Sequence, residues 1–329
     1  MPDMRRREFI TLLGGAAAWP LAARAQQAGK VWRVGFLSGG APAAVGPILA
    51  GFPQGMRELG YVEGKDFTIE GRFTEGNYDR IPGFAAEFVR LKVDVIAVAT
   101  AAAIRIVQQA TTTIPIVMSY STDPVGNGFV ASLARPGGNT TGVASSTDDS
   151  APKQIELLAT IAPNVKRIGL IGNPDNPNHS SLLQRAEAAA RAAGLVVAPL
   201  DVRNAAEIEN AFAAMARERV QAILVGADAM ILTERRRIGE LALAARLPSM
   251  FVQRENVEVG GLMSYGESIK EFNRRAAVFV DKIFKGAKPG ELPIEQPTRF
   301  HLVINRKTAD ALGVTILPQL YILADEVIE

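Results

Sequence analysis

The sequence contains no cysteine and only two histidines, His179 and His301, among 329 residues. Without cysteine the chain has neither disulfides nor thiolate metal ligands, so its stability must come from apolar cores, which this length can supply. A His-rich metal site is excluded, and a histidine-based triad would need one of these two residues. His179 is expected at a helix start as a surface or capping residue, and His301 in a strand with a structural role, because neither has a partner motif.

Catalytic and cofactor-binding motifs are also missing. The sequence has no G-x-S-x-G nucleophile elbow and no G-x-x-x-x-G-K-[ST] phosphate loop. Residues 126–131 fit G-x-G-x-x-A, but a dinucleotide fingerprint follows its strand directly and opens the first βα unit. Here residues 121–124 intervene, the motif lies in the fourth unit, and Asp123 would face a bound phosphate. We interpret the match as chance and predict no catalytic residue, no metal and no cofactor.

The first 25 residues are typical of a secretory signal peptide. A basic start at residues 5–7 precedes an apolar run at 9–21 and an A-x-A site at 23–25. The paired arginines followed by residues 8–10 resemble a twin-arginine export signal. A membrane anchor is the alternative, but the run is shorter than a span and contains two glycines and a proline. We expect export to the periplasm with cleavage near Ala25.

The net charge gives no basic footprint for nucleic acid. The whole chain carries a formal charge of +2, and cleavage of the signal peptide would remove the excess of basic residues. Hydrophobic residues make up 48% of the chain, charged residues 21% and aromatic residues 6%, which is an ordinary globular composition. The length favours two domains over one.

Short β-rich runs alternate with longer helical patterns from residue 31 onward, which predicts βαβ units around parallel sheets. The first half predicts strands at 31–38, 66–73, 93–100 and 114–120 and helices at 43–59, 79–91 and 101–110. The alternation restarts after residue 152, with strands at 167–173, 195–202, 220–228, 248–253, 260–266 and 300–306 and helices at 152–161, 178–193, 205–218, 230–246, 267–285 and 306–312. The fold class is therefore α/β, with two consecutive Rossmann-like lobes of parallel sheet flanked by helices. The polar segment 135–152 lies between them as the crossover, and "TTGVASS" within it can form a short crossing strand.

Ligands of open α/β sheets bind beyond the carboxyl ends of the strands, so the residues at the strand exits are the candidate site. These exits carry two hydroxyls, two carboxylates, an amide and a phenol, at Ser38, Thr100, Asp123, Asn173, Asp228 and Tyr265. Exits from both halves would face each other across a cleft.

Each of these residues also has a structural interpretation. Ser38 and Thr100 can cap helices, or leave the helix N–H groups to a ligand anion. Asp123, which precedes a proline, and Asp228 can start helices or pair with a ligand ammonium group. Tyr265 can be a half-buried sheet residue or a stacking face.

Four stretches carry a family resemblance: "VGFLSGG", "FTIEGRFTEGNYDRIPGFAAEFVRLKVDVIAV", "STDPVGNGFVASLARPGGNTTGV" and "RIGLIGNPDNP". They are similar to the substrate-binding proteins of ABC transporters, in the TrpX-like group, over nearly the whole mature chain. The resemblance implies a type I periplasmic-binding fold, with three crossovers as hinge and a ligand between two lobes. It places the same six residues along the cleft. The sequence departs from the family after the third strand, where Thr100 is followed by three alanines.

The resemblance implies an N-terminal lobe at 31–143 with part of 268–290, and a C-terminal lobe at 144–267 with part of 291–329. The expected function is an exported, monomeric, non-enzymatic receptor that binds a small molecule, such as an aromatic or branched amino acid, and delivers it to an ABC permease in the inner membrane. The alternatives are an exported sensor or enzyme on the same scaffold. A repressor of this fold would need a DNA-binding headpiece, for which the sequence before the first strand leaves no room, so no nucleic-acid partner is expected.

Overall fold

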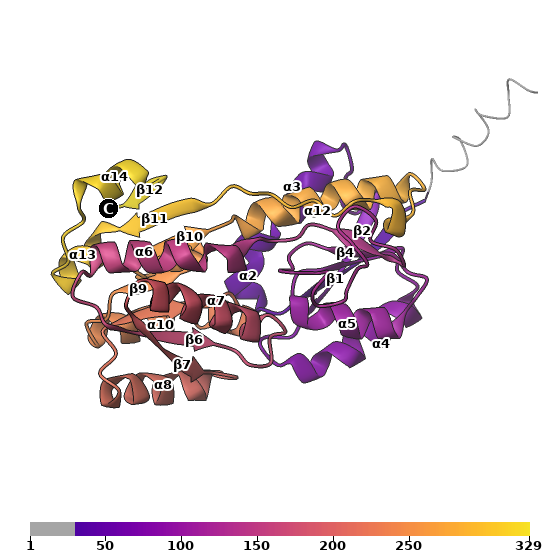
Figure 1. Cartoon of the computed structure of the whole chain (residues 1–329). Helices are drawn as coiled ribbons and strands as arrows, with labels where there is room; N and C mark the ends of the chain where they lie inside the picture. The colour runs from indigo at the N-terminus through magenta and orange to yellow at the C-terminus, as the bar shows by residue number, and fades with distance from the viewer. Residues whose placement is uncertain (1–29) are drawn as a thin grey trace, which may run out of the picture.

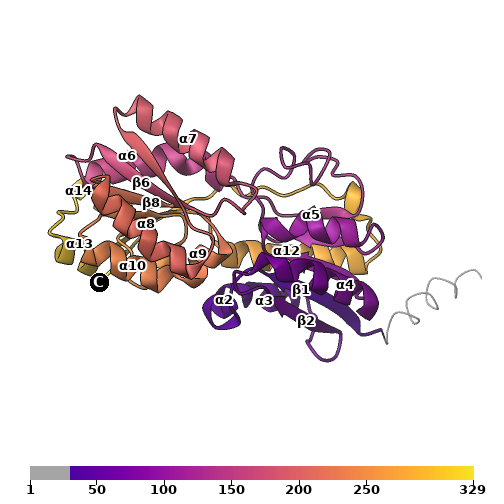
Figure 2. The ribbon, with the colours of Figure 1, turned by 90° about the horizontal axis from the view of Figure 1, so that it is seen from below.

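The protein consists of two α/β lobes that lie side by side (Figures 1 and 2), in a computed structural model that describes residues 30–329 apart from the side chain of Asp148. The first sheet has the strand order β2-β1-β3-β4-β5, and the second has the order β12-β11-β10-β9-β8-β6-β7. All described pairs are parallel except β10 with β11. The predicted fold class is confirmed. The predicted signal peptide, residues 1–25, lies outside the described residues.

The first lobe follows the predicted alternation. Its strands are β1 (Trp32–Ser38), β2 (Phe67–Phe73), β3 (Val95–Val98), β4 (Ile116–Met118) and β5 (Thr140–Gly142), and its helices include α2 (Pro42–Leu49), α3 (Gly51–Glu58), α4 (Ile81–Leu91) and α5 (Ala101–Ala110). The central strands are continuous apolar runs because helices cover both faces of the sheet. The crossing strand expected within "TTGVASS" is β5, at the edge of this sheet.

The helix predicted at 43–59 is divided in two at Ala50. Pro47 lies inside α2, where it lacks an N–H group and removes one hydrogen bond from the helix. Beyond the break, α3 lies directly on helix α12 (Ile269–Phe284): a Cβ atom at Gly51 would lie 2.1 Å from the carbonyl oxygen of Lys270. The chain bends at Ala50, and the backbones of α3 and α12 pack directly against each other.

Helix α12 follows most of the second lobe in the chain but packs on the first sheet, where it runs beside α3 (Figure 1). Its buried Phe272, Phe279 and Phe284 join one apolar cluster with Phe36 and Phe52. The opposite face of the sheet is covered by α4 and α5. The first lobe therefore takes part of its core from residues that follow the second lobe.

The second lobe has seven strands and eight helices among the described residues. Its strands are β6 (Arg167–Gly172), β7 (Val196–Asp201), β8 (Ala222–Val225), β9 (Ser249–Phe251), β10 (Met263–Gly266), β11 (His301–Asn305) and β12 (Glu326–Ile328). Its helices are α6 (Ala151–Ile161), α7 (His179–Ala192), α8 (Ala205–Arg217), α9 (Ala229–Thr233), α10 (Arg235–Ala244), α11 (Arg254–Val257), α13 (Arg306–Leu312) and α14 (Pro318–Leu323). The helix predicted at 230–246 is two helices, and α11, α14 and β12 have no counterpart in the prediction.

The chain passes between the lobes three times: after β5, between β10 and α12, and between α12 and β11. Glu267 in the second crossover accepts hydrogen bonds from Ser145, from Ser146 Oγ at 3.1 Å and from Thr147 Oγ1 at 2.9 Å in the first. Burial raises the pKa of Glu267, while these donors oppose the shift. The third crossover is tied to the first by the Ala144 N–H, which donates to the Glu295 carbonyl at 2.8 Å. The three segments form the predicted hinge.

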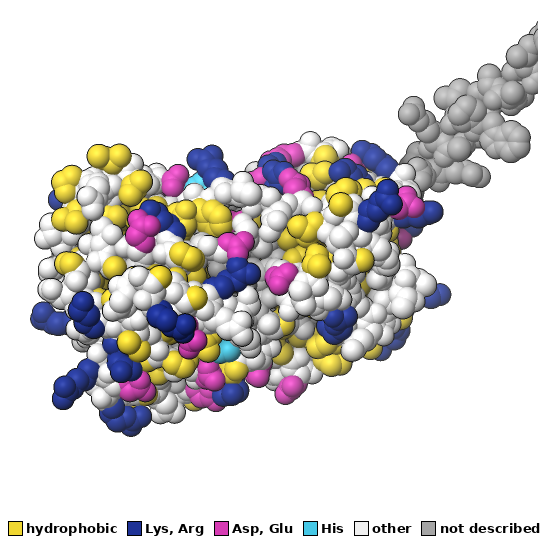
Figure 3. Space-filling model, in the orientation of Figure 1, with side chains coloured by type: hydrophobic (Ala, Val, Ile, Leu, Met, Phe, Trp, Pro, Cys, Tyr) yellow, Lys and Arg dark blue, Asp and Glu magenta, His cyan; other side chains and the backbone are white. Residues whose placement is uncertain are grey.

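Basic and acidic side chains are mixed over the face of the molecule drawn in Figure 3. Among residues 30–329, no helix combines the length and the apolar character that a membrane span requires.

Candidate functional site

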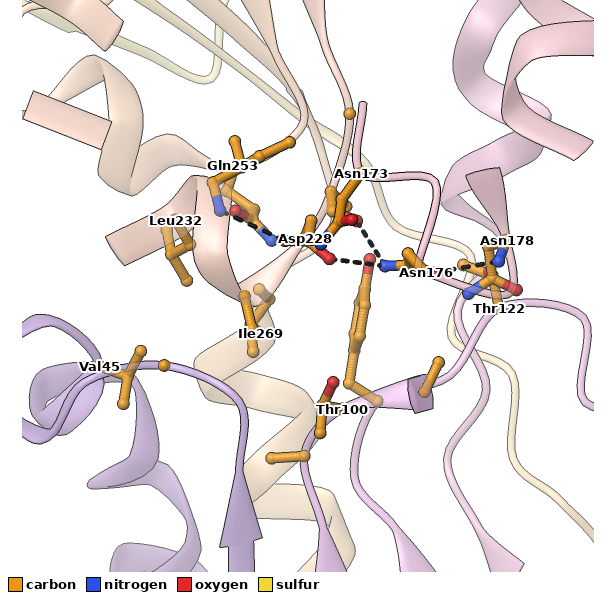
Figure 4. Close-up of a pocket in the computed structure, with 18 of the residues that line it drawn as sticks. Val45, Thr100, Thr122, Asn173, Asn176, Asn178, Asp228, Leu232, Gln253 and Ile269 are labelled. Carbon is orange, nitrogen blue, oxygen red and sulfur yellow. Dashed lines mark hydrogen bonds between the residues drawn. The ribbon is translucent and has the colours of Figure 1, made fainter. Parts of the chain in front are cut away.

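A pocket lies between the lobes, beyond the carboxyl ends of strands from both sheets (Figure 4). Its polar lining residues are Ser38, Thr100, Tyr120, Thr122, Asn173, Asn176, Asn178, His179, Asp228 and Gln253. Four of the six predicted site residues are in this lining: Ser38, Thr100, Asn173 and Asp228. These four residues are up to 190 positions apart in the sequence, and they meet in the pocket because each lies at the carboxyl end of a strand.

Ser38 and Thr100 face the pocket from the first lobe. Ser38 ends β1, is 3% exposed, and its Oγ lies 3.4 Å from the N–H group of Gly40. Thr100 is the N-cap of α5 by position, with extended backbone, but its side chain makes no capping hydrogen bond to the described residues of α5. A helix N-terminus without a side-chain cap presents N–H groups and a positive dipole end, which suit a ligand anion.

Asp228 lies on the opposite side of the pocket, is 5% exposed and caps α9. Its Oδ1 accepts from the backbone N–H groups of Met230 at 2.9 Å and Ile231 at 3.3 Å, and from Asn173 Nδ2 at 3.3 Å. Its Oδ2 accepts from Asn176 Nδ2 at 3.0 Å and from the hydroxyl of Tyr78 at 2.8 Å. A carboxylate has about four lone-pair positions, so these described donors fill its accepting capacity.

Asp123 lies outside the pocket lining, and the helix predicted to start there is wrong. Asp123 is exposed and has a φ of 39°, in the left-handed region, whereas an N-cap residue has extended backbone. Its carboxylate accepts instead from the N–H group of Gly126 at 2.8 Å and closes a turn. Arg105 then holds the turns that follow, because its Nη2 donates to the carbonyls of Asn127 and Gly128.

Tyr265 also lies outside the pocket lining. It is half-buried in β10, and its ring stacks on that of Phe300 with 5.3 Å between centroids. Strand β10 leads into the second crossover, and its neighbour β11 runs antiparallel to it. Of its two predicted roles, the structure shows the half-buried sheet residue; its stacking partner belongs to the protein itself.

Beyond Asn173, the same loop and the start of α7 supply lining residues that were not among the predicted site residues, namely Asn176, Asn178 and His179. Asn178 Oδ1 accepts from Asn127 Nδ2 of the first lobe at 2.7 Å. His179 was expected at the surface or as a cap, but its side chain is only 10% exposed, lines the pocket and lies with Nε2 3.1 Å from Asp201 Oδ1. The signal available in the sequence was the cluster of Asn and Pro that follows β6 directly.

One wall of the pocket is apolar. Val45, Ile48, Leu232 and Ile269 form a buried cluster with contributions from both lobes and from α12. In Figure 4, Val45, Leu232 and Ile269 lie on one side, and Asn176, Asn178 and Thr122 lie on the other. The pocket therefore suits a ligand with a polar end and an apolar end.

The pocket lining contains few ionisable side chains. Within residues 30–329, the lining contains Asp228 and His179 and no Lys or Arg. No three His, Cys, Asp or Glu side chains in that range gather closely enough to hold a metal ion. What the arrangement offers is hydrogen bonding and apolar contact in an enclosed space, which is the chemistry of a binding site.

Two α/β lobes that are joined by three crossovers around such a pocket define a type I periplasmic-binding fold, the architecture of solute-binding proteins. The chain belongs to the family of ABC transporter substrate binding proteins, whose model matches residues 39–328. The recognised resemblance is thereby confirmed.

Individual relatives match most of this chain. A tyrosine-binding protein of Clostridioides difficile (strain R20291) is 25% identical over 279 residues, which cover 84% of this chain and 80% of that protein. The crystal structure of an ABC domain from Streptococcus pneumoniae in complex with L-Trp has a TM-score of 0.85 and 28% identity, covering 91% of this chain and 100% of that chain. A conserved domain protein from Vibrio cholerae gives the same TM-score, identity and coverage.

Proposed function

We propose that this protein is the exported solute-binding component of an ABC importer and that its ligand is an aromatic amino acid. The observation that carries the proposal is the two-sided pocket between the lobes. Hydroxyls and amides lie on one side, and the apolar cluster of Val45, Ile48, Leu232 and Ile269 lies on the other. The similar proteins described as binding tyrosine and in complex with L-Trp support the same ligand class. A ligand that touches both lobes favours the closed state by its differential affinity.

In this proposal the ligand carboxylate lies against Ser38, Thr100 and the N-terminus of α5, where uncapped N–H groups favour an anion. The ammonium group points toward the second lobe, on the side of Asp228 and the amides. The aromatic ring packs against Leu232 and Ile269. Since lobe closure then performs the function, the protein needs no catalytic group, and the partner that receives the ligand is an ABC permease in the inner membrane.

The experiment is a thermal-shift screen of the mature protein against amino acids, purines and sugars, followed by calorimetry. A ligand at 100 times its Kd adds about 2.7 kcal/mol to the free energy of unfolding and raises the Tm. We expect L-tyrosine or L-tryptophan to raise the Tm and tyramine, which lacks the carboxylate, to fail. Absence of binding by all aromatic amino acids would reject the proposed ligand class.

Matched variants test the carboxylate site. Thr100→Ala removes a lining hydroxyl and should weaken binding of the amino acid, while Thr160→Ala removes a hydroxyl that bonds the Glu156 carbonyl on α6, away from the pocket. Equal affinities of the two variants would contradict the placement. For export, the periplasmic protein should begin at Gln26 by N-terminal sequencing; a mature chain that retains residues 1–25 would contradict the proposed cleavage.

A further inference from the structure

Tyr78 reaches from the first lobe to the second. It follows β2, in a short 3-10 turn (Tyr78–Arg80), and its ring packs against the core of the first lobe. Its hydroxyl donates to Asp228 Oδ2 at 2.8 Å, and Asp228 belongs to the second lobe as the N-cap of α9. This hydrogen bond therefore joins the two lobes directly, at a residue that lines the pocket.

The same short helix α9 receives other contacts from the first lobe. A Cβ atom at Gly39 would lie 2.5 Å from the Cβ of Ala229, and one at Gly76 would lie 3.1 Å from Cγ of Met230. The N–H group of Ala41 lies 3.3 Å from Thr233 Oγ1. Loops after β1 and β2 thus close onto α9, and the Tyr78–Asp228 bond is the charge-assisted member of this contact.

Asp228 is poorly placed to bind a ligand ammonium group in addition to its partners within the protein. Its described donors come from Tyr78, Asn173, Asn176 and the first turn of α9, and they fill both carboxylate oxygens. Burial and the neighbouring Asp228 raise the pKa of Tyr78 well above its ordinary value, so the phenol keeps its proton and remains a donor. In the closed state, a ligand ammonium group would have to displace one of these donors.

We propose that Tyr78 is a positioning residue that stabilises the closed cleft through its hydrogen bond to Asp228, which we call the latch. Asp228 then acts on ligand affinity through this latch and not by pairing with a ligand ammonium group. The second part rests on the proposed amino-acid ligand. The first part does not, because the hydrogen bond is made between two residues of the protein itself.

The ligand-free measurement compares Tyr78→Phe with the wild type. The chain has no cysteine, so spin labels can be attached at Val62→Cys on the first lobe and Val196→Cys on the second, both 53% exposed. A hydrogen bond to a charged group supports a shift of about tenfold in an equilibrium constant. We expect Tyr78→Phe to lower the closed-to-open ratio by about tenfold, seen as a shifted label distance and a larger radius of gyration in X-ray scattering.

Tyr61→Phe is the matched control, because the Tyr61 hydroxyl donates to Asp281 Oδ1 at 2.9 Å within the first lobe. It removes the same kind of bond without touching the cleft. The latch is supported if Tyr78→Phe shifts the distances and Tyr61→Phe does not. Wild-type distances in Tyr78→Phe, or an equal shift in both variants, overturn it.

A double-mutant cycle tests the role of Asp228, with L-tyrosine as the probe. If Asp228 acts through the latch, Asp228→Asn weakens binding in the wild type but has little further effect in the Tyr78→Phe background. The same loss of affinity in both backgrounds means that Asp228 pairs with the ligand, which overturns this part. If L-tyrosine binds no variant, the proposed ligand class fails instead, and the label distances alone decide on the latch.

Discussion

Replacing Gly39 by alanine should hold the two lobes apart. Gly39 lies between β1 and α2 and faces Ala229 at the start of α9. The added Cβ would lie 2.5 Å from the Cβ of Ala229, where ordinary van der Waals contact is 3.4–4 Å. The backbone of Gly39 is outside the left-handed region, so alanine is compatible with its conformation. The lobes must therefore separate by about 1 Å or more at this contact, since an overpacked interface relaxes by opening.

The size of the effect follows from the cost of overpacking, which is about 1–3 kcal/mol. Only the closed state bears the cost of the contact with Ala229, whereas the milder contact with Thr100 Oγ1, at 3.2 Å within the first lobe, is present in both states. At about 1.4 kcal/mol for each factor of ten, the closing equilibrium and the affinity for a ligand that requires closure should fall by about 5- to 150-fold. The free energy of unfolding of the ligand-free protein should change little, because neither lobe loses part of its core.

Calorimetry with the ligand found in the screen measures this loss, and scattering of the ligand-free protein measures the opening. Ala229→Gly supplies the control, because it removes the methyl group that the new side chain would meet. Combined with Gly39→Ala, it should restore both binding and the compact scattering profile. Wild-type affinity in Gly39→Ala, or failure of the second substitution to rescue it, would refute the closed contact between these loops.

Three further predictions concern stability. Because the pKa of buried Glu267 is raised, the folded protein binds its proton more tightly than the unfolded chain, so this residue should lower the Tm as pH rises above 4.5, and Glu267→Gln should reduce that slope in a pH series of melting curves. Tyr61→Phe should lower the free energy of unfolding in urea by about 1.5–3 kcal/mol at pH 7. Burial and Asp281 raise the pKa of Tyr61 to about 12, so this difference in stability between the wild type and the variant should disappear as pH rises from 10 through 12. Gly142→Ala should lower the free energy of unfolding by about 3 kcal/mol or more in the same assay, because Gly142 has a φ of 131° and the new Cβ would lie 2.1 Å from the Met118 carbonyl oxygen. A variant as stable as the wild type would contradict the close pairing of β4 with β5.

Much of the fold is readable from the sequence because the central strands are buried on both faces. Continuous apolar runs such as residues 95–98 and 222–225 are strands in the structure, and the helices between them lie close to their predicted positions. Breaks within helices were harder to predict. The division at Ala50 depends on how closely α3 approaches α12, which is a contact between distant parts of the chain.

The site could be predicted only in part. Ser38 ends β1, and Thr100 and Asp228 lie within three residues of the ends of β3 and β8, so a search at the strand exits leads to them. Asp123 lies outside the pocket lining, because its residue type suits both a helix cap and a tight turn, and its left-handed backbone belongs to the turn. Tyr78 was missed because it lies several residues beyond the end of β2, and its hydrogen bond to Asp228 forms only where the second lobe approaches the first.

The position of α12 in the chain has a consequence for how the protein folds. During synthesis, the residues of the first sheet emerge well before Phe272, Phe279 and Phe284, which complete its apolar core. Until α12 arrives, one face of that sheet stays open, so the first lobe cannot finish folding as an independent unit. A fragment that ends at Gly266 would expose this face and should aggregate, and no single cut divides the protein into two stable halves.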